Sequence, residues 1–219
     1  GWLLQLSSKL TGVASSEGMF IAGRQTQKAN AAHWAGAHRL LTNRLAQAAV
    51  IQTTARSILE EGLAYDRCLV GVVTDMDGYE GLADHDVLEQ AKMTRVLRTQ
   101  IDVVLDEGAG VLNADIAQVA ELAPLCDGEV LLYSTSADNA AVAAHRAEGE
   151  GRAVFVRAGQ VILATGASER VLGSLQALSL PGGQQPDTTA LLAAIATAWS
   201  MHIGPDLIAA GIKTFEYQI

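Results

Sequence analysis

The chain has 219 residues, of which 49% are hydrophobic, so it is long enough to bury a core of ordinary size. Its formal charge of −9 and its scattered lysines and arginines argue against a basic face and therefore against a nucleic-acid partner. No apolar run approaches the ~20 residues that a membrane-spanning helix needs, and no signal peptide is recognisable, so no membrane partner is expected. Cys68 and Cys126 have no metal-ligand spacing, which favours reduced thiols and a cytoplasmic location.

Apolar runs of strand length alternate with helical patterns along the first 150 residues. The expected strands are 48–53, 68–75, 101–105, 110–115 and 129–134, and the expected helices are 31–46, 55–63, 86–100 and 115–123. Such alternation is typical of an α/β fold with three layers, in which a mostly parallel sheet has helices on both faces. We expect 48–53, 68–75, 110–113 and 129–134 to share that sheet, with the helix 55–63 forming a right-handed crossover.

The pattern changes after about residue 150. Two short alternating runs around Ala158 and Gly159 predict a small β-hairpin over 152–165, set to one side within a β-rich subregion of about 150–180. Asp187 is expected to cap a helix that begins at Thr188, and Pro205 to start a last short helix. No internal repeat and no clear linker occur, so we expect residues 1–219 to form a single domain.

An acidic segment, "TDMDGYEGLADHD" at 74–86, follows the apolar run 68–73 and contains five acidic residues and one histidine. It does not fit a calcium-binding loop, because Tyr79 and Glu80 stand where that loop needs Asp or Asn and then Gly. A solvated turn is the simpler interpretation. A ligand site is the alternative, because the segment would leave the carboxyl end of a parallel strand.

Four longer stretches carry a resemblance to a known family. They are "GLAYDRCLVGVVTDMDG", "VLRTQIDVVL", "GAGVLNADIAQVAELAPLCDGEVLLYS" and "AAHRAEGEGRAVFVRAGQVILATG". Their order and spacing resemble the central ligase domain of cyanophycin synthetase, a relative of the Mur peptidoglycan ligases, from about Glu17 to residue 215. The resemblance implies ATP and Mg²⁺ as cofactors and ATP-dependent amide-bond formation on an aspartate and arginine polymer. It implies as partners the missing ligase domains, an active synthetase subunit or further copies of the chain.

The positions that the resemblance assigns to phosphate and metal binding carry other residues. No Gly-Lys pair of a P-loop occurs, and the chain opens inside what the family makes the helix after that loop. Gln52 replaces a metal-binding glutamate, and a neutral amide oxygen binds Mg²⁺ more weakly than a carboxylate. Asn30, Ala32 and His33 stand where the family has an Asp, a hydroxyl residue and a Gly.

The acidic segment departs from the family in the same way. Gly81 stands where the family has a metal-binding histidine, and His85 lies four residues further on. The sequence therefore predicts no catalytic residue and no metal ligand in this chain. Asn113 and Asp115 match the Asn-x-Asp element on the rim of the family's adenine pocket and are the candidate cofactor-binding residues.

Two of the family-like features also have a structural interpretation. Asn113 and Asp115 follow a strand and could equally cap the next helix. His145 and Arg146 also look family-like, although a simple surface pair on a solvent-facing helix is favoured.

Two functions remain open at this point. The chain is either a ligase module that is active only with its missing domains, or a degenerate, non-catalytic paralogue used for assembly or binding. The substitutions at Gln52, Ala32 and Gly81 lead us to expect no activity from the isolated chain. A small nucleotide-binding regulator that uses only Asn113 and Asp115 is a third, weaker hypothesis.

Overall fold

The computed structural model describes residues 1–178 and 187–215, which form two compact units. The first unit contains Gly1–Asp66 and Gly78–Val96. The second contains Arg67–Asp77 and Leu97–Phe215. The expectation of a single domain stays a prediction.

The first unit is built on a four-stranded sheet. Its order is β3-β2-β1-β4, with β1 Thr11–Ser15, β2 Gly18–Ile21, β3 Arg24–Gln27 and β4 Ala48–Ile51. The helices are α1 Trp2–Leu6, α2 Trp34–Leu41 and α3 Ala55–Glu61. Strand β1 pairs antiparallel with β2 and parallel with β4, and α2 packs on both β1 and β4. A small core of Ala14, Met19, Ala31 and Leu40 fills the space between α2 and the sheet.

The second unit is built on a six-stranded sheet of order β10-β9-β8-β7-β6-β5. Its strands are β5 Cys68–Val73, β6 Val104–Asn113, β7 Glu129–Ser134, β8 Arg152–Arg157, β9 Gln160–Thr165 and β10 Ser168–Ser174. Strands β5 to β8 are parallel, and β8, β9 and β10 are antiparallel.

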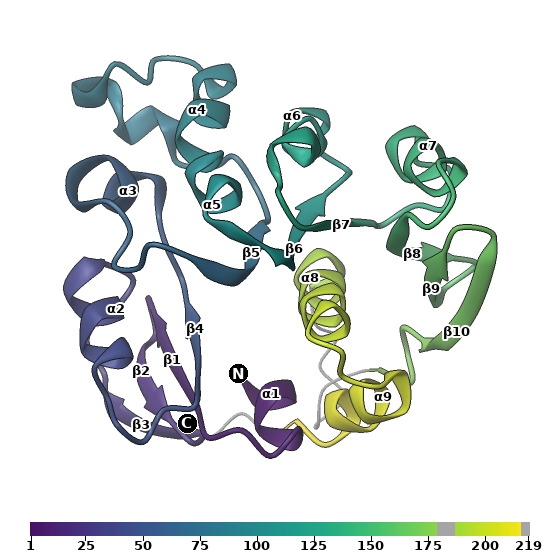
Figure 1. Ribbon diagram of the computed structural model, residues 1–219, viewed down its shortest axis with the longest axis horizontal. Helices are drawn as coiled ribbons and strands as arrows, with labels where there is room; N and C mark the ends of the chain where they lie inside the picture. The colour runs from purple at the N-terminus through teal and green to yellow at the C-terminus, as the bar shows by residue number, and fades with distance from the viewer. Residues whose placement is uncertain (179–186, 216–219) are drawn as a thin grey trace. The chain divides into compact units, whose positions relative to one another are not determined.

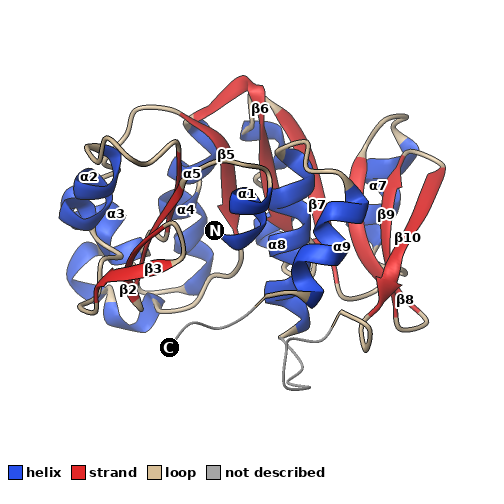
Figure 2. Ribbon diagram, turned by 90° about the horizontal axis from the view of Figure 1, so that it is seen from below, coloured by secondary structure: helices blue, strands red, loops and turns tan. Residues whose placement is uncertain are grey.

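Helices cover both faces of the six-stranded sheet. They are α5 Thr99–Asp102, α6 Ala117–Ala120, α7 Ala140–Ala147, α8 Thr188–Ser200 and α9 Pro205–Lys213. Helix α4, Met93–Leu97, contains one of the points at which the chain passes from one unit to the other. Helices α6 and α7 lie on one face, and α8 crosses the opposite face of β5 to β8 (Figures 1 and 2). The α/β class with a mostly parallel sheet, expected from the sequence, is therefore confirmed.

Local chemistry that the sequence predicts sets the start of α8 and the turn between β8 and β9. The side chain of Asp187 accepts a hydrogen bond from the backbone N–H of Ala190 at 3.0 Å and so caps α8. Ala158 and Gly159 have φ values of +49° and +74°, the left-handed pair that a two-residue hairpin turn requires. The predicted hairpin is therefore confirmed. It extends the main sheet through β8 and does not stand to one side of it.

Three details differ from expectation. Residues 48–51 pair with β1 in the first unit, so the single sheet expected to hold them with 68–75 is wrong. The apolar pattern does not predict β1 to β3, over 11–27, because these strands are short and together rich in polar residues and glycine. The expected strands 101–105 and 110–115 are mostly one strand, β6, preceded by the helical turn α5.

Two strands lie at sheet edges although their sequences are wholly apolar apart from glycine and cysteine. Strand β4, "AAVI", ends one sheet and β5, "CLVGVV", ends the other within the described residues. Ala49 is exposed, and Leu69 is 47% exposed. No helix in the described part of the chain is long and apolar enough to cross a bilayer.

Candidate functional site

Asn113, the first candidate for cofactor binding, ends β6 and is only 3% exposed. Its Nδ2 donates to the backbone oxygen of Thr74 at 2.8 Å, and its Oδ1 accepts from the backbone N–H of Asp115 at 3.0 Å. The amide therefore joins the segment after β5 to the end of β6. Most of its surface is already in contact with this chain's own atoms.

Asp115, the second candidate, joins β6 to β7. Its carboxylate accepts hydrogen bonds from the hydroxyl of Ser134, from the backbone N–H of Thr135 at 2.8 Å and from the Thr135 hydroxyl at 2.7 Å. The N-cap of α6 is Ile116, which supplies no side-chain hydrogen bond, so neither candidate caps that helix. Both residues tie together the carboxyl ends of β5, β6 and β7, a place where open α/β sheets bind ligands.

Tyr133 lies opposite Asn113 in the β6–β7 register and is completely buried. Its hydroxyl has no hydrogen-bond partner among the described residues. Burial, followed by the nearby carboxylates of Asp75, Asp115 and Asp187, raises the pKa of Tyr133 well above its ordinary value. The phenol therefore stays neutral at every physiological pH.

Gln52, which replaces the family's metal-binding glutamate, follows β4 in the first unit. Its Oε1 accepts from the backbone N–H of Ser16 at 2.9 Å and from the Ser16 hydroxyl at 3.2 Å. Ser16 lies in the tight turn between β1 and β2. The amide oxygen at the expected metal position thus stabilises a turn.

His33 and Asn30, at the second altered position, serve as local caps. The Nδ1 of His33 accepts from the backbone N–H of Gly36 at 3.2 Å and caps α2, so Nε2 carries the proton and donates to the Asn30 carbonyl at 3.1 Å. The Oδ1 of Asn30 accepts from the backbone N–H of Ala32 at 2.8 Å. These polar groups therefore already have hydrogen-bond partners within the chain.

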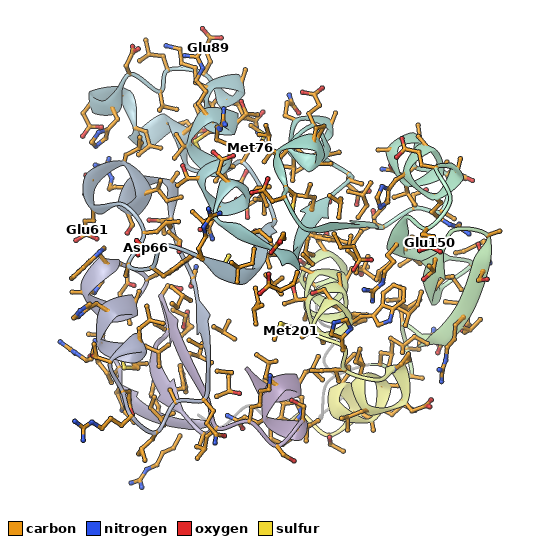
Figure 3. All side chains as sticks on the ribbon, viewed as in Figure 1. Glu61, Asp66, Met76, Glu89, Glu150 and Met201 are labelled. Atoms are coloured by element: carbon orange, nitrogen blue, oxygen red, sulfur yellow. The ribbon has the colours of Figure 1, made fainter. Side chains whose placement is uncertain are left out.

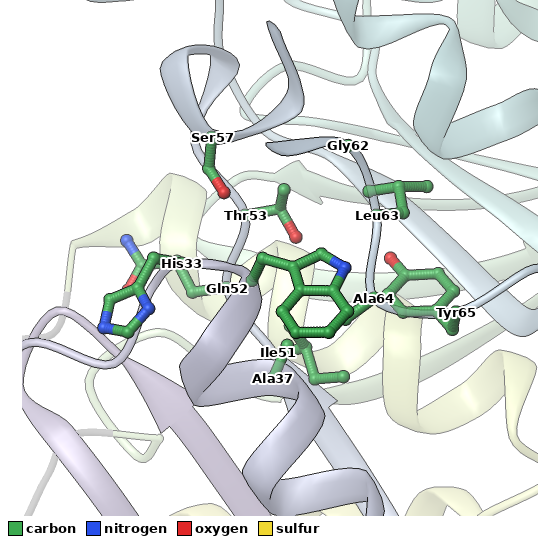
Figure 4. Close-up of a pocket in the computed structure, with 11 residues that line it drawn as sticks. His33, Ala37, Ile51, Gln52, Thr53, Ser57, Gly62, Leu63, Ala64 and Tyr65 are labelled. Atoms are coloured by element: carbon green, nitrogen blue, oxygen red, sulfur yellow. The ribbon is translucent and has the colours of Figure 1, made fainter. Parts of the chain in front are cut away.

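A small cavity opens beside these residues, within the first unit (Figure 4). Its lining includes Trp34, Gln52, Thr53, Ser57 and Tyr65. Its volume of about 10 Å³ is room for roughly one water molecule, far below the several hundred cubic ångströms of a nucleotide-sized pocket. Glu61, at the end of α3 (Figure 3), accepts a hydrogen bond from the Trp34 backbone N–H at 2.9 Å and so links α3 to the start of α2.

A charged cluster that the sequence did not reveal joins α3 to the acidic segment. The Nε2 of His85 lies 3.4 Å from Glu60 Oε1 and 3.7 Å from Asp84 Oδ2. Nη1 of Arg56 contacts the same two oxygens at 2.6 and 3.3 Å, and Nη2 donates to the carbonyl of Gly81. The hydrogen bond from Arg56 lowers the pKa of Glu60. No sequence signal links Glu60 to His85, because 25 residues separate them.

His145 and Arg146 are more than the surface pair favoured from the sequence. His145 Nε2 lies 3.0 Å from the Val130 carbonyl and connects α7 to β7. Arg146 donates from Nε to the Gly166 carbonyl and from Nη2 to Glu169, both at 2.9 Å, and its guanidinium lies 5.2 Å from the centre of the Phe155 ring. The surface interpretation is wrong, because both side chains hold α7 against the sheet.

The fold that carries these sites is also found in solved structures of ligases. The chain matches a UDP-N-acetylmuramoylalanyl-D-glutamyl-2,6-diaminopimelate--D-alanyl-D-alanyl ligase from Acinetobacter baumannii over 98% of this chain and 42% of that one, with a TM-score of 0.61 and 12% identity. A murein peptide ligase from Psychrobacter arcticus gives a TM-score of 0.55 at 12% identity, over 98% of this chain and 43% of that one. The chain thus has the fold of the Mur ligases.

Sequence similarity is more specific. The cyanophycin synthetase of Crocosphaera subtropica is 30% identical over 96% of this chain and 24% of that protein. The enzyme of that name from Synechocystis is 30% identical over 95% of this chain and also 24% of that protein. The chain is a homologue of one segment of the cyanophycin synthetases, and it spans about a quarter of their length. No family model matches it.

Proposed function

We propose that this chain is a ligase-type module that does not transfer phosphoryl groups itself and that serves a partner ligase as a binding or assembly domain. One observation carries the proposal. The side-chain oxygen of Gln52, at the position that the resemblance gives to a metal-binding carboxylate, accepts both hydrogen bonds of Ser16. A neutral oxygen held in this way is a poor ligand for Mg²⁺.

Phosphoryl transfer depends on positioning and on neutralising the charge of the transferred group. Neither is provided by His33 and Asn30, whose polar atoms cap α2 and its approach. The residues present therefore do not fit a Mg²⁺–triphosphate group, and we derive no catalytic step through one.

The direct test is release of phosphate from ATP by the purified chain, with Mg²⁺, aspartate, arginine and their polymer present. We expect no release above a buffer blank. The matched variants are Gln52→Ala and Asn113→Ala. Gln52 stands at a position where the family residue is replaced, and Asn113 at one where it is retained. Mg²⁺-dependent release that disappears in both variants would refute the proposal, whereas release unaffected by either comes from a contaminating enzyme.

The binding role predicts a stable association with the catalytic partner. The partner would be the remaining ligase domains, an active synthetase subunit or further copies of this chain. Analytical ultracentrifugation of the chain, alone and mixed with an active cyanophycin synthetase, should show a complex heavier than either component. Independent sedimentation at all concentrations would contradict an assembly role and leave the nucleotide as the remaining candidate ligand.

The adenine interpretation of Asn113 and Asp115 is the second candidate function. If these residues contact only a base, adenosine and ATP should bind equally and weakly, with a dissociation constant of about 1 mM, or about −4 kcal/mol. Ligand-detected NMR with both compounds measures this. Micromolar, Mg²⁺-dependent binding of ATP would contradict both this interpretation and the non-catalytic function.

A further inference from the structure

We propose that Glu60, Asp84 and His85 form a binding site for a borderline divalent cation such as Zn²⁺, and that the Arg56 guanidinium occupies it when no metal is bound. The three ligand atoms lie within 4.8 Å of one another. This site is separate from phosphoryl transfer. It uses neither Gln52 nor the side-chain position of Gly81, where the resemblance would place a metal.

The distances between the ligand atoms suit a tetrahedral ion. With ligand bonds of about 2.0–2.2 Å, neighbouring ligand atoms around Zn²⁺ stand about 3.3–3.6 Å apart. His85 Nε2 lies 3.4 Å from Glu60 Oε1 and 3.7 Å from Asp84 Oδ2. The imidazole nitrogen and both oxygens can therefore reach one ion after small side-chain rotations, with water in the fourth position.

The ligand set also selects the kind of ion. An imidazole favours Zn²⁺, Cu²⁺ or Ni²⁺, whereas Mg²⁺ prefers oxygen ligands only. The side chain of His85 is 26% exposed, so its ring is partly fixed, and those of Glu60 and Asp84 are 43% and 61% exposed. The site thus lies at the surface, where an ion can enter without any opening of the fold.

The positive charge of the Arg56 guanidinium already lies beside the two carboxylates of this site. Nη1 of Arg56 lies 2.6 Å from Glu60 Oε1 and 3.3 Å from Asp84 Oδ2, which are the same two oxygens offered to the ion. The Arg56 side chain is 45% exposed and can turn into solvent when a metal replaces it. The replacement exchanges one positive charge for two beside two carboxylates, which favours the ion electrostatically.

Metal binding would fasten the segment around Ala83–His85 to α3. Glu60 belongs to α3 (Ala55–Glu61), while Asp84 and His85 belong to a single turn of 3-10 helix. A metal that binds only the folded arrangement stabilises it by an amount that grows with the logarithm of the free-ion concentration above the dissociation constant. Its role here is to rigidify the acidic segment.

The test is isothermal titration calorimetry of the full chain with Zn²⁺, repeated with Mg²⁺. We expect a single saturable Zn²⁺ site and no comparable heat from Mg²⁺. His85→Ala and the nearly isosteric Glu60→Gln should each weaken Zn²⁺ binding at least about tenfold, since even a lost supporting contact costs that much. Arg56→Ala should tighten it. A rise in melting temperature with Zn²⁺ should be present in the wild type and absent in His85→Ala.

The controls remove other ligands for zinc. His38→Ala deletes an exposed histidine that stacks on Trp34, and should leave binding unchanged. A double variant, Cys68→Ser with Cys126→Ser, deletes the free thiols and should also bind normally. Absence of saturable binding in both the wild type and Arg56→Ala would overturn the proposal. So would binding that survives His85→Ala and Glu60→Gln, or affinity that does not rise in Arg56→Ala.

Discussion

At the scale of single residues, the buried hydroxyl of Tyr133 gives a simple prediction. A buried polar group without a partner costs about 1–3 kcal/mol, and none of the described residues accepts this hydroxyl. Tyr133→Phe should therefore leave the free energy of unfolding unchanged or raise it by up to about 1 kcal/mol. Urea denaturation measures the difference. A loss of more than about 1 kcal/mol would mean that the hydroxyl has a partner in the folded chain.

Asn113 gives the opposite prediction, because both the nitrogen and the oxygen of its side-chain amide make hydrogen bonds. Asn113→Ala breaks the bond to the Thr74 carbonyl and leaves buried groups unpaired, which should cost about 1–3 kcal/mol. Denaturation of the variant, compared with Asp115→Asn as a matched change on the same link, measures this. An undiminished stability together with lost adenosine binding would instead favour a purely ligand-binding role.

The candidate site was predictable only in part, for reasons visible in these residues. A resemblance placed Asn113 and Asp115 at the end of a strand, where the structure has them. It could not say that their polar atoms bond to Thr74, Ser134 and Thr135, because partners distant in sequence become neighbours only when strands pair. The cluster around Arg56 was unpredictable for the same reason.

At the scale of elements, α8 depends on its N-cap residue, Asp187. Asp187 accepts from the Ala190 backbone N–H, one of the unpaired donors at the helix start. Asp187→Ala should lower the free energy of unfolding by about 1 kcal/mol, whereas Asp187→Ser should retain most of it. Thermal or urea melts of the two variants decide this, and equal losses would show that a hydroxyl cannot replace the carboxylate there.

The carboxylate of Glu169 holds the outer strand β10 through ion pairs with Arg146 and Arg157, and its contribution to stability depends on its ionisation. The guanidinium of Arg157, and with it that of Arg146, lowers the pKa of Glu169 below its ordinary value. A lowered carboxyl pKa stabilises the fold above the unfolded pKa, and the stabilisation is lost as pH falls through the folded pKa. Glu169→Gln should cost about 1 kcal/mol near pH 7, a modest value for a partly exposed ion pair.

The cost of Glu169→Gln should shrink as the pH falls through the folded-state pKa of the wild-type carboxyl, because that carboxyl then becomes protonated and loses its charge as well. Urea melts of both proteins at several pH values give the comparison. A difference that stayed constant with pH would show that the ion pairs do not contribute.

The fold was more predictable than the site, because it depends on repeating patterns. Alternating apolar runs gave β5, β6 and β7 and their parallel order, and turn chemistry gave the hairpin at Ala158 and Gly159. The strands of 11–27 escaped because polar and glycine residues interrupt their pattern. The pairing of β4 with β1 could not be inferred without them.

At the scale of the whole molecule, the two outermost apolar strands have a consequence for handling the protein. An edge strand without charge or proline presents unpaired N–H and C=O groups, with which other chains can pair. The net charge of −9 opposes such association at low salt, and salt screens that repulsion. The isolated chain should therefore self-associate as ionic strength rises.

Light scattering across a salt series would detect this colloidal instability. Ala49→Lys places a charge on the exposed face of β4 and should suppress it, while Ala120→Lys, which adds the same charge on α6, should not. A monodisperse wild type in high salt would show that both edges are already protected. If association does occur, a purified sample of this chain alone has a limited shelf life.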